Sequence, residues 1–463
     1  MSSSPLRIAI VGSGPAGFYA AEQLLKAEAV DVTVDLFERL PTPWGLVRFG
    51  VAPDHPKIKA VTRRYEKTAG MEGFRFFGNV EVGRDISVQE LKDHYHAVLY
   101  AFGAAGDRRL GIPGEELAGS HSSTEFVAWY NGHPDFCDYE FDLTATTVVV
   151  VGNGNVALDV ARMLALPRET LVRTDVADHA LDALDASSIE EVVVLGRRGP
   201  AQAAFTTPEL IELSELAAAD VIVDPGDTEL DAASRRMVEE ADAQTKKKIE
   251  VLRGYAASEP HGHERRIVLR FFASPLELVG SERVEGVRVG RTELVEQEDG
   301  SLRAVVTEVE ELIPAQLVFR SVGYRGIPLE GVPFDERSAT IPNDRGRVLD
   351  APGGTQQPGE YVSGWIKRGP SGIIGTNKKD SQETVDALLE DVAAGKLPQP
   401  PVTDPDAIET LLAERVPDHI TYAHWQAIDA AERSAGEPHG RPRIKLTRVE
   451  HLLDAARSAL ARD

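Results

Sequence analysis

The chain has 463 residues, enough for two or three domains with a large buried core, and its formal net charge is −24 at pH 7. That charge argues against non-specific nucleic-acid binding, and no apolar run is long enough to predict a transmembrane helix. The single cysteine, Cys137, excludes an internal disulfide, a redox-active cysteine pair and an iron–sulfur cluster held by thiolates of this chain.

The first predicted element is a strand that runs directly into a glycine-rich turn. Residues 8–11 form a short uncharged apolar run, which is typical of a strand buried on both faces. Gly12, Gly14 and Gly17 follow with the spacing G-x-G-x-x-G, and a helix pattern runs from about 18 to 26. In such a turn the first glycine permits the bend, the second admits a pyrophosphate and the third lets helix and strand pack closely. The N–H groups at the start of the helix would face the phosphates.

A second apolar run, residues 32–37, ends in Glu38. The glutamate lies roughly 20–25 residues beyond the glycines, where an acid binds the ribose hydroxyls of a dinucleotide. Strand, glycines, helix, strand and acid in this order predict a dinucleotide-binding unit, although Glu38 alone could be a solvated strand end. The following segments are predicted as a folded apolar loop, a helix, a strand or strand pair, and a buried strand, at residues 39–50, 56–69, 74–82 and 97–102.

A second nucleotide fingerprint follows a predicted domain crossing near Ala105. The apolar strand 146–151 meets Gly152 and Gly154 in the pattern G-x-G-x-x-A. Its last position, Ala157, is still small enough for close packing of helix and strand. The pattern therefore predicts a second dinucleotide-binding unit.

The next strand of this second unit suggests which nucleotide it binds. Residues 191–195 end in a turn that carries Arg197 and Arg198, not in an acid. Two arginines at this place favour a 2′-phosphate over a free ribose hydroxyl, and hence NADP over NAD. The alternative is a solvated basic turn.

The rest of the chain continues the alternation of helices and strands. Residues 231–251 are charged and helical, and 361–365 form a short strand before a glycine-rich run that opens a helix ending near 394. Further strands are predicted at 267–272, 284–289, 304–309 and 317–322, and C-terminal helices at 407–415, 424–435 and 446–460.

The two fingerprints and three longer motifs together resemble the adrenodoxin-reductase-like ferredoxin–NADP⁺ reductases. The motifs are the runs 45–56, 196–199 and 364–375, and the likeness covers roughly residues 5–395. It implies an α/β fold with two Rossmann-like, three-layer nucleotide-binding domains, the NADP domain being inserted into the FAD domain. The implied boundaries are 1–105 and 326–400 for the FAD domain, 106–325 for the NADP domain and 401–463 for a C-terminal helical extension of the FAD domain.

The resemblance also implies which residues bind each cofactor. The implied FAD-binding residues are Gly12, Gly14, Ala16, Gly17, Glu38, Leu46, Val82, Trp365, Gly372, Ile373 and Ile374. The implied NADP-binding residues are Asn153, Gly154, Asn155, Val156, Arg197, Arg198, Glu209 and Gly372. Ala101-Phe102-Gly103 departs from the Ala-Thr-Gly of related flavoproteins, so a threonine contact is not expected there. The absence of a targeting segment like that of mitochondrial members predicts a bacterial-type cytoplasmic enzyme.

The implied reaction passes electrons from NADPH through FAD to an iron–sulfur protein. NADPH gives a hydride pair and an iron–sulfur protein accepts single electrons, and a flavin can do both. The protein then needs neither a nucleophile nor a metal; it needs the two rings stacked and the flavin edge exposed. His55 and Asp159 are candidates for handling protons near the flavin. Their alternatives are a structural hydrogen bond for the histidine and a helix-surface or capping role for the aspartate.

An acidic ferredoxin would be repelled by this acidic chain unless positive charge is gathered locally. The preferred docking cluster consists of Arg235, Arg236, Lys246, Lys247 and Lys248. Two further basic clusters lie within 57–67 and 367–379, and each of the three clusters could be an ordinary solvated face. We expect the protein to be a monomer.

Other functions remain open at this level. The missing cysteine pair removes a disulfide reductase, whereas a flavin monooxygenase and a nucleotide-binding protein without turnover remain. The electron acceptor, which could be a ferredoxin of either cluster size, a flavodoxin or a cytochrome-P450 chain, is not identified. Neither is the direction of electron flow.

Overall fold

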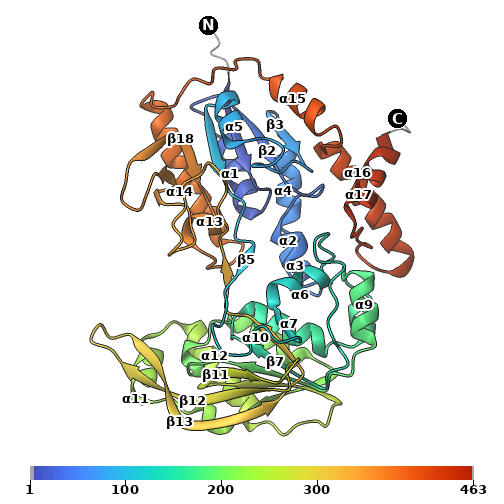
Figure 1. Cartoon of the computed structure of the whole chain (residues 1–463), viewed down its shortest axis with the longest axis vertical. Coiled ribbons are helices and arrows are strands. Elements are labelled where there is room, and N and C mark those ends of the chain that lie inside the picture. Colours follow the sequence, from blue (N-terminus) through green and yellow to red (C-terminus); the bar gives the residue numbers. More distant parts are fainter. Residues whose placement is uncertain (1–4, 461–463) are drawn as a thin grey trace. The chain divides into compact units, whose positions relative to one another are not determined.

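In a computed structural model, residues 5–460 are described, and the chain divides into two compact units. One unit comprises Met1–Gly106 and Tyr324–Asp463, and the other comprises Asp107–Gly323. The chain passes between them through β5 (Gly106–Asp107) and β15 (Tyr324–Arg325), which pair as a two-stranded sheet (Figure 1). None of the described helices combines the length and the apolar character needed to cross a membrane.

The first unit is built on a seven-stranded sheet with the order β16-β17-β18-β4-β1-β2-β3. The strands from β18 to β3 are parallel, and β16 and β17 add an antiparallel edge. The strands are β1 (Leu6–Val11), β2 (Val32–Phe37), β3 (Phe74–Phe77), β4 (Ala97–Tyr100), β16 (Asn343–Asp344), β17 (Arg347–Leu349) and β18 (Gln356–Val362). The helices are α1 (Pro15–Leu25), α2 (Leu46–Phe49), α3 (Pro56–Lys59), α4 (Thr62–Ala69), α5 (Val88–His94), α13 (Trp365–Arg368), α14 (Thr376–Ala393), α15 (Ala407–Arg415), α16 (Tyr422–Gly436) and α17 (Val449–Leu460).

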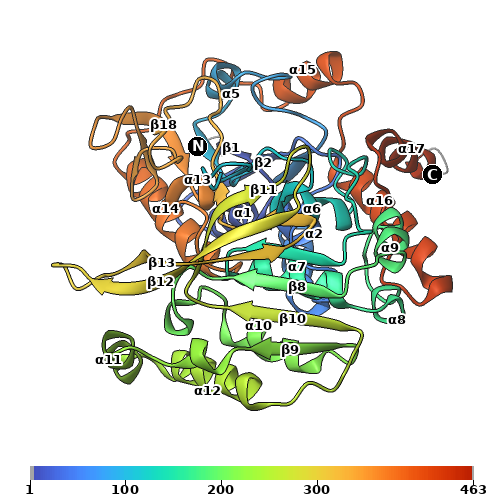
Figure 2. The same ribbon diagram turned by 60° about the horizontal axis from the view of Figure 1, so that its bottom comes forward.

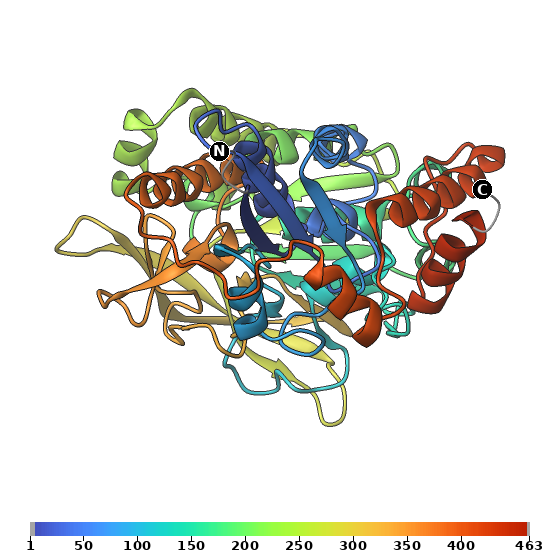
Figure 3. The same cartoon turned by 90° about the horizontal axis from the view of Figure 1, so that it is seen from above.

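Both faces of this sheet are covered, which explains the continuous apolar runs at residues 8–11 of β1 and 97–100 of β4. Ile8 and Ile10 point to one face and pack with residues of α1 and α14, whereas Ala9 and Val11 point to the other and pack with residues of α5 and α15. Helices α16 and α17 pack against each other and against the first of these clusters, and they are the red pair at the right of Figure 3. The unit therefore has three layers, as predicted.

The second unit is built on a six-stranded parallel sheet with the order β6-β14-β7-β8-β10-β9. Its strands are β6 (Ser120–Ser122), β7 (Thr147–Val151), β8 (Glu191–Leu195), β9 (Ala219–Val223), β10 (Arg265–Arg270) and β14 (Leu317–Arg320). An antiparallel sheet consists of β11 (Ala273–Val279), β12 (Gly286–Glu296) and β13 (Leu302–Pro314). The helices are α6 (Ser123–Tyr130), α7 (Asn155–Ala165), α8 (Arg168–Leu171), α9 (Asp178–Asp185), α10 (Thr207–Glu212), α11 (Ala232–Glu240) and α12 (Ala243–Ala257).

The layers of the second unit differ in kind from those of the first. Val148 and Val150 pack with helical residues, whereas Val149 and Val151 pack with residues of the antiparallel sheet. In Figure 2, β12 and β13 form a long hairpin that extends beyond the parallel strands. The third layer is thus an antiparallel sheet, which the sequence did not predict.

Several predicted elements are wrong in their limits. The helix predicted over 56–69 is interrupted between Lys59 and Thr62, and the strand predicted over 74–82 ends at Phe77. The helix predicted over 231–251 breaks at Asp242, whose side chain accepts a hydrogen bond from the Thr245 N–H and begins a new helix. The strands β9, β11, β16 and β17 were not predicted. Trp365, predicted to end a strand, is the first residue of α13.

Candidate dinucleotide sites

The first glycine turn lies between β1 and α1, and two of its glycines are required by geometry. Gly12 has φ +105°, and a Cβ there would lie 2.6 Å from the Phe102 Cα. A Cβ at Gly17 would lie 2.1 Å from the carbonyl oxygen of Gly12. A side chain at Gly12 would therefore collide with the backbone that follows β4, and one at Gly17 would push α1 away from the turn after β1.

Gly14 is different, because a Cβ at this position would meet no atom within 4 Å. Its backbone is extended, with φ −74° and ψ −174°, and it precedes the first turn of α1 without any side-chain cap. The first N–H groups of a helix have no partner within the helix, so this end is free to bind an anion. The open space at Gly14 fits a pyrophosphate.

Glu38, at the end of β2, is hydrogen-bonded to the same turn. Its Oε2 accepts from the backbone N–H of Ser13 at 3.2 Å and from the Ser13 Oγ at 2.5 Å. Its Oε1 accepts from the Leu40 N–H at 3.1 Å. The carboxylate is thus fixed beside the glycine turn, where a ribose hydroxyl of a bound dinucleotide would reach it.

Two distant segments of the first unit also contact the turn. The Trp44 N–H donates to the Ser13 carbonyl at 3.0 Å, and α2 begins two residues later at Leu46. A Cβ at Gly364 would lie 2.7 Å from the Cβ of Ala16, and Trp365 follows directly. The fold thus brings Gly14, Ala16, Glu38, Leu46 and Trp365 to one region.

Asp380 of α14 is a residue that the sequence reasoning missed. It accepts hydrogen bonds from the Gly364 N–H at 2.5 Å and from the Ser363 Oγ at 3.3 Å, and so holds the turn that presents Trp365. Nothing distinguishes Asp380 from the other charged residues of its helix in the sequence.

The remaining implied flavin contacts have different surroundings. Val82 is buried and packs with Phe77 in the core. Gly372 has φ +80°, and Ile373 is 59% exposed, which is unusual for a large apolar side chain. Ile374 is partly buried against the core of the first unit. Their contact with a flavin stays a prediction.

The second glycine turn, between β7 and α7, repeats the geometry of the first. Gly152 has φ +126°, and a Cβ there would lie 2.1 Å from the Ser321 carbonyl oxygen. A Cβ at Gly154 would meet no atom within 4 Å, and the backbone there is extended. The open approach to the start of α7 therefore fits a second pyrophosphate.

Asn153 and Asn155 tie this turn to the segment that leads to α10. The Asn153 carbonyl accepts from the Phe205 N–H at 2.9 Å, and the Asn155 Oδ1 accepts from the Thr206 N–H at 2.8 Å. Val156, the next residue, packs partly buried against the core. Glu209, on α10, is thereby placed near the start of α7.

Asp159 and Glu209 share one arginine. The Asp159 Oδ1 lies 2.7 Å from Arg162 Nη2, and the Glu209 Oε2 lies 3.7 Å from Arg162 Nη1; all three residues are buried. The structure therefore places both acids next to the same buried arginine within the second unit. His55 is buried in the first unit, immediately before α3. A proton-handling role for His55 and Asp159 stays a prediction.

The two arginines after β8 are positioned by their backbone while their side chains are exposed. The Arg197 carbonyl accepts from Thr292 Oγ1 at 2.7 Å, and the Arg198 carbonyl accepts from the Phe272 N–H at 3.2 Å. Neither guanidinium forms an ion pair with another residue in the described part of the chain. Two unpaired cations on a fixed turn suit a phosphate.

The predicted basic docking cluster is smaller in the structure than in the sequence. Lys248 is buried and donates to the Ala203 carbonyl at 2.7 Å, so its inclusion was wrong. Arg236 pairs with Glu296 at 2.8 Å, and Lys247 pairs with Glu250 at 2.9 Å. The charges that remain exposed without an ion pair to another described residue are Arg235 and Lys246.

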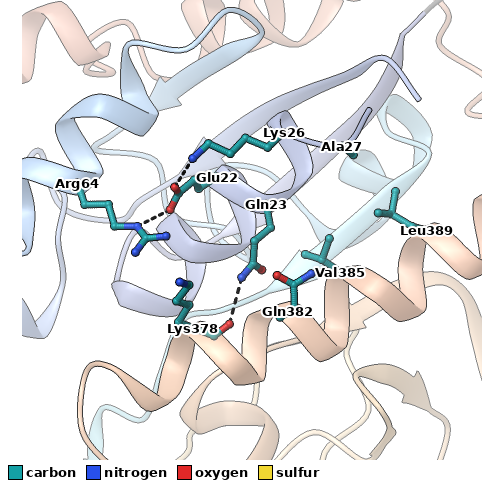
Figure 4. Close-up of a pocket in the computed structure, with 9 residues that line it drawn as sticks. All are labelled: Glu22, Gln23, Lys26, Ala27, Arg64, Lys378, Gln382, Val385 and Leu389. Carbon is teal, nitrogen blue, oxygen red and sulfur yellow. Dashed lines mark hydrogen bonds and ion pairs between the residues drawn. The ribbon is translucent and has the colours of Figure 1, made fainter. Parts of the chain in front are cut away.

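The first unit also has a groove of about 390 Å³, which is lined by none of the residues of the first glycine turn (Figure 4). It is bordered by the C-terminal half of α1, by Arg64 of α4 and by α14. Glu22 crosses one side of it, paired with Lys26 at 2.6 Å and with Arg64 at 2.5 Å. Because the glycine turn precedes the opposite end of α1, this groove is not the dinucleotide site.

Comparison with known proteins gives consistent matches. A family model described as pyridine nucleotide-disulphide oxidoreductase matches residues 6–193. NADPH-ferredoxin reductase FprA of Mycobacterium tuberculosis is 53% identical over 457 residues, which cover 97% of this chain and 98% of that protein. The mitochondrial NADPH:adrenodoxin oxidoreductase of Salvelinus fontinalis is 42% identical over 471 residues, which cover 99% of this chain and 92% of that protein. A solved structure of M. tuberculosis FprA in complex with NADPH is similar with a TM-score of 0.92 and 51% identity, covering 98% of this chain and 99% of that one.

Proposed function

This chain belongs to the adrenodoxin-reductase-like family of ferredoxin–NADP⁺ reductases, and from that premise we propose that it oxidises NADPH through bound FAD and reduces a ferredoxin. FAD supplies the chemistry that accepts a hydride and releases electrons one at a time. The observation that carries the proposal is the pair of open glycine turns at Gly14 and Gly154, each at the start of a helix. The reaction runs in either direction in principle.

We assign one cofactor to each unit. FAD binds the unit of Gly14 and Glu38, to which the segment from 324 onward, including the C-terminal helices, also belongs. NADPH binds the unit of residues 107–323, with Arg197 and Arg198 at its 2′-phosphate. The residues of this chain bind and orient the two nucleotides. The protein acts as a monomer in a bacterial-type cytoplasm.

The proposal is tested by following NADPH oxidation with the purified yellow protein. We expect oxidation to require an added acceptor, and ferredoxin to be reduced in proportion to the NADPH consumed. A flavin monooxygenase would instead consume oxygen stoichiometrically with an organic substrate. A protein that binds both nucleotides but shows no turnover with any ferredoxin or dye would contradict the proposal.

The choice of NADPH over NADH is expected to depend on the arginine turn. Replacing Arg197 and Arg198 together with alanine removes two charge-assisted contacts to a 2′-phosphate, so the KM for NADPH should rise about 10- to 100-fold. The kinetics with NADH, which lacks that phosphate, should change little. The matched control is Arg303→Ala, an exposed arginine of β13 in the same unit. Equal losses with both nucleotides would refute the assignment.

Ferredoxin docking is expected to involve Arg235 and Lys246. Replacing both with alanine should raise the KM for ferredoxin several-fold, more at low salt, and leave dye reduction unchanged, because only the protein partner senses this surface. Arg236→Ala with Lys247→Ala is the control, since these charges are already paired with glutamates and should matter less. A parallel loss of dye reduction, or no change in KM, would exclude this surface.

A further inference from the structure

The C-terminal helix α16 is joined to the α2 segment by an ion pair that is shielded from water. Arg48, in α2, donates from Nη1 to the Glu432 Oε2 at 2.9 Å and from Nη2 to the Oε1 at 2.5 Å. The side chains are 2% and 0% exposed, although the residues are 384 positions apart. A buried, bidentate pair of this kind is costly to break by removing one partner.

Glu432 is held by more than this one arginine. It also accepts from Arg443 Nη1 at 3.1 Å and from the Leu446 N–H at 2.9 Å. Burial by itself would raise the pKa of Glu432, but the attraction of Arg48 and Arg443 outweighs it and keeps the pKa below its ordinary value. Lys445, in the segment after α16, donates from Nζ to the Arg48 carbonyl at 3.1 Å. Arg48 is thus bonded through its side chain to α16 and through its backbone to the following segment.

Aromatic side chains reinforce the contact. The rings of Trp44 and Trp425 lie edge to face with centroids 4.8 Å apart, and the Arg48 guanidinium lies 5.3 Å from the Trp425 ring. Trp44 has φ +88°, a left-handed conformation that a residue with a side chain adopts only when its surroundings hold it there. These surroundings include the Trp425 ring of α16 and the Arg443 guanidinium, which lies 5.9 Å from the Trp44 ring.

The segment Trp44–Phe49, which α16 contacts, also contacts the first glycine turn. The Trp44 N–H donates to the Ser13 carbonyl at 3.0 Å, and Ser13 also binds Glu38 through its N–H and Oγ. A Cβ at Gly45 would lie 3.0 Å from the Cα of Gly14. An unbroken series of contacts therefore runs from α16 through Trp44 to the turn.

We infer that Glu432 is a positioning residue for the flavin site, because with Trp425 it fixes the Trp44–Phe49 segment against the glycine turn. The inference rests on the proposed binding of FAD at that turn. It assigns a function to α16 and the segment that follows it: they support the flavin site, and FAD affinity depends on them.

The test compares FAD binding by wild-type protein and by the variant Glu432→Gln, which keeps the shape of the side chain and removes its charge. We expect the dissociation constant of FAD, measured on flavin-stripped protein by titration, to rise at least tenfold. We also expect backbone amides of residues 44–50 to exchange hydrogen faster in the stripped variant than in stripped wild type. Should Glu432→Gln not fold, Lys445→Met is the second variant, because it removes only the hydrogen bond to the Arg48 carbonyl. We expect its FAD dissociation constant to rise about threefold.

The matched control is Asp391→Asn. Asp391 is a buried carboxylate of the same unit that accepts from Arg347 at 2.8 Å and from Tyr361 at 2.9 Å, and none of its hydrogen-bond partners is in the glycine turn or α2. This control should lose stability while its FAD dissociation constant changes less than threefold. Equal effects of the two substitutions on FAD affinity, or no effect of Glu432→Gln, would overturn the inference. Wild-type protein that binds no FAD at all would instead refute the proposed function.

Discussion

Replacing Gly14 with valine is expected to give a folded protein that contains almost no flavin. The backbone at Gly14 is in a region that valine adopts readily, and its Cβ would meet no protein atom within 4 Å. The added methyl groups would occupy the approach of the pyrophosphate to the start of α1. We expect flavin occupancy below about a tenth of wild type, measured by absorbance after release of the cofactor, with unchanged far-UV circular dichroism.

Gly254 provides the control for this substitution. A Cβ at Gly254, in α12 of the other unit, would also meet no atom within 4 Å, so Gly254→Val tests the general effect of a valine in an open place. That variant should keep its flavin. If Gly14→Val contained as much flavin as the wild-type protein, the first glycine turn would not be the site that binds the pyrophosphate of FAD.

The corresponding substitution in the second unit is expected to separate the two cofactors. Gly154→Val leaves the first turn untouched, so the variant should be yellow with full flavin occupancy. Its valine would block the open start of α7, and the dissociation constant of NADP⁺, measured by flavin difference spectroscopy, should rise at least about 100-fold. Reduction of the flavin by dithionite, which needs no nucleotide site, should be normal. Loss of flavin together with NADP⁺ binding, or unchanged NADP⁺ affinity, would contradict the assignment of one nucleotide to each unit.

The elements that could be predicted best are those determined by a local pattern. The strand 191–195 and the helix 407–415 match their predicted limits. Three successive valines mark the strand, and Pro405 and Pro417 bound the helical segment, so both signals are visible in a few residues. The predicted ends of elements were wrong where a single capping side chain determines them, as Asp242 does between α11 and α12. The predicted strand limits were also wrong near β11, which begins directly after Phe272. Phe272 has φ +54°, and the apolar pattern of the sequence does not reveal this change of backbone direction.

The same division holds for the candidate sites. The arrangement of Gly12, Gly14, Gly17 and Glu38 was predictable because strand, turn, helix and second strand follow one another in the sequence, and a steric clash explains the glycines at 12 and 17. The contact of Arg48 with Glu432 was not, because a pairing across 384 residues depends on the tertiary fold alone. Lys248 shows the converse error: its place in a basic run suggested exposure, but its position on α12 turns it inward to backbone carbonyls.

Anaerobic mixing of the purified protein with NADPH tests the central claim most directly. Flavin absorbance should fall on addition of one equivalent of NADPH per FAD, and subsequent ferredoxin should restore it by taking up two electrons one at a time. A protein that cannot be reconstituted with FAD would contradict the account. So would bound flavin whose absorbance stays unchanged with NADPH while dithionite reduces it.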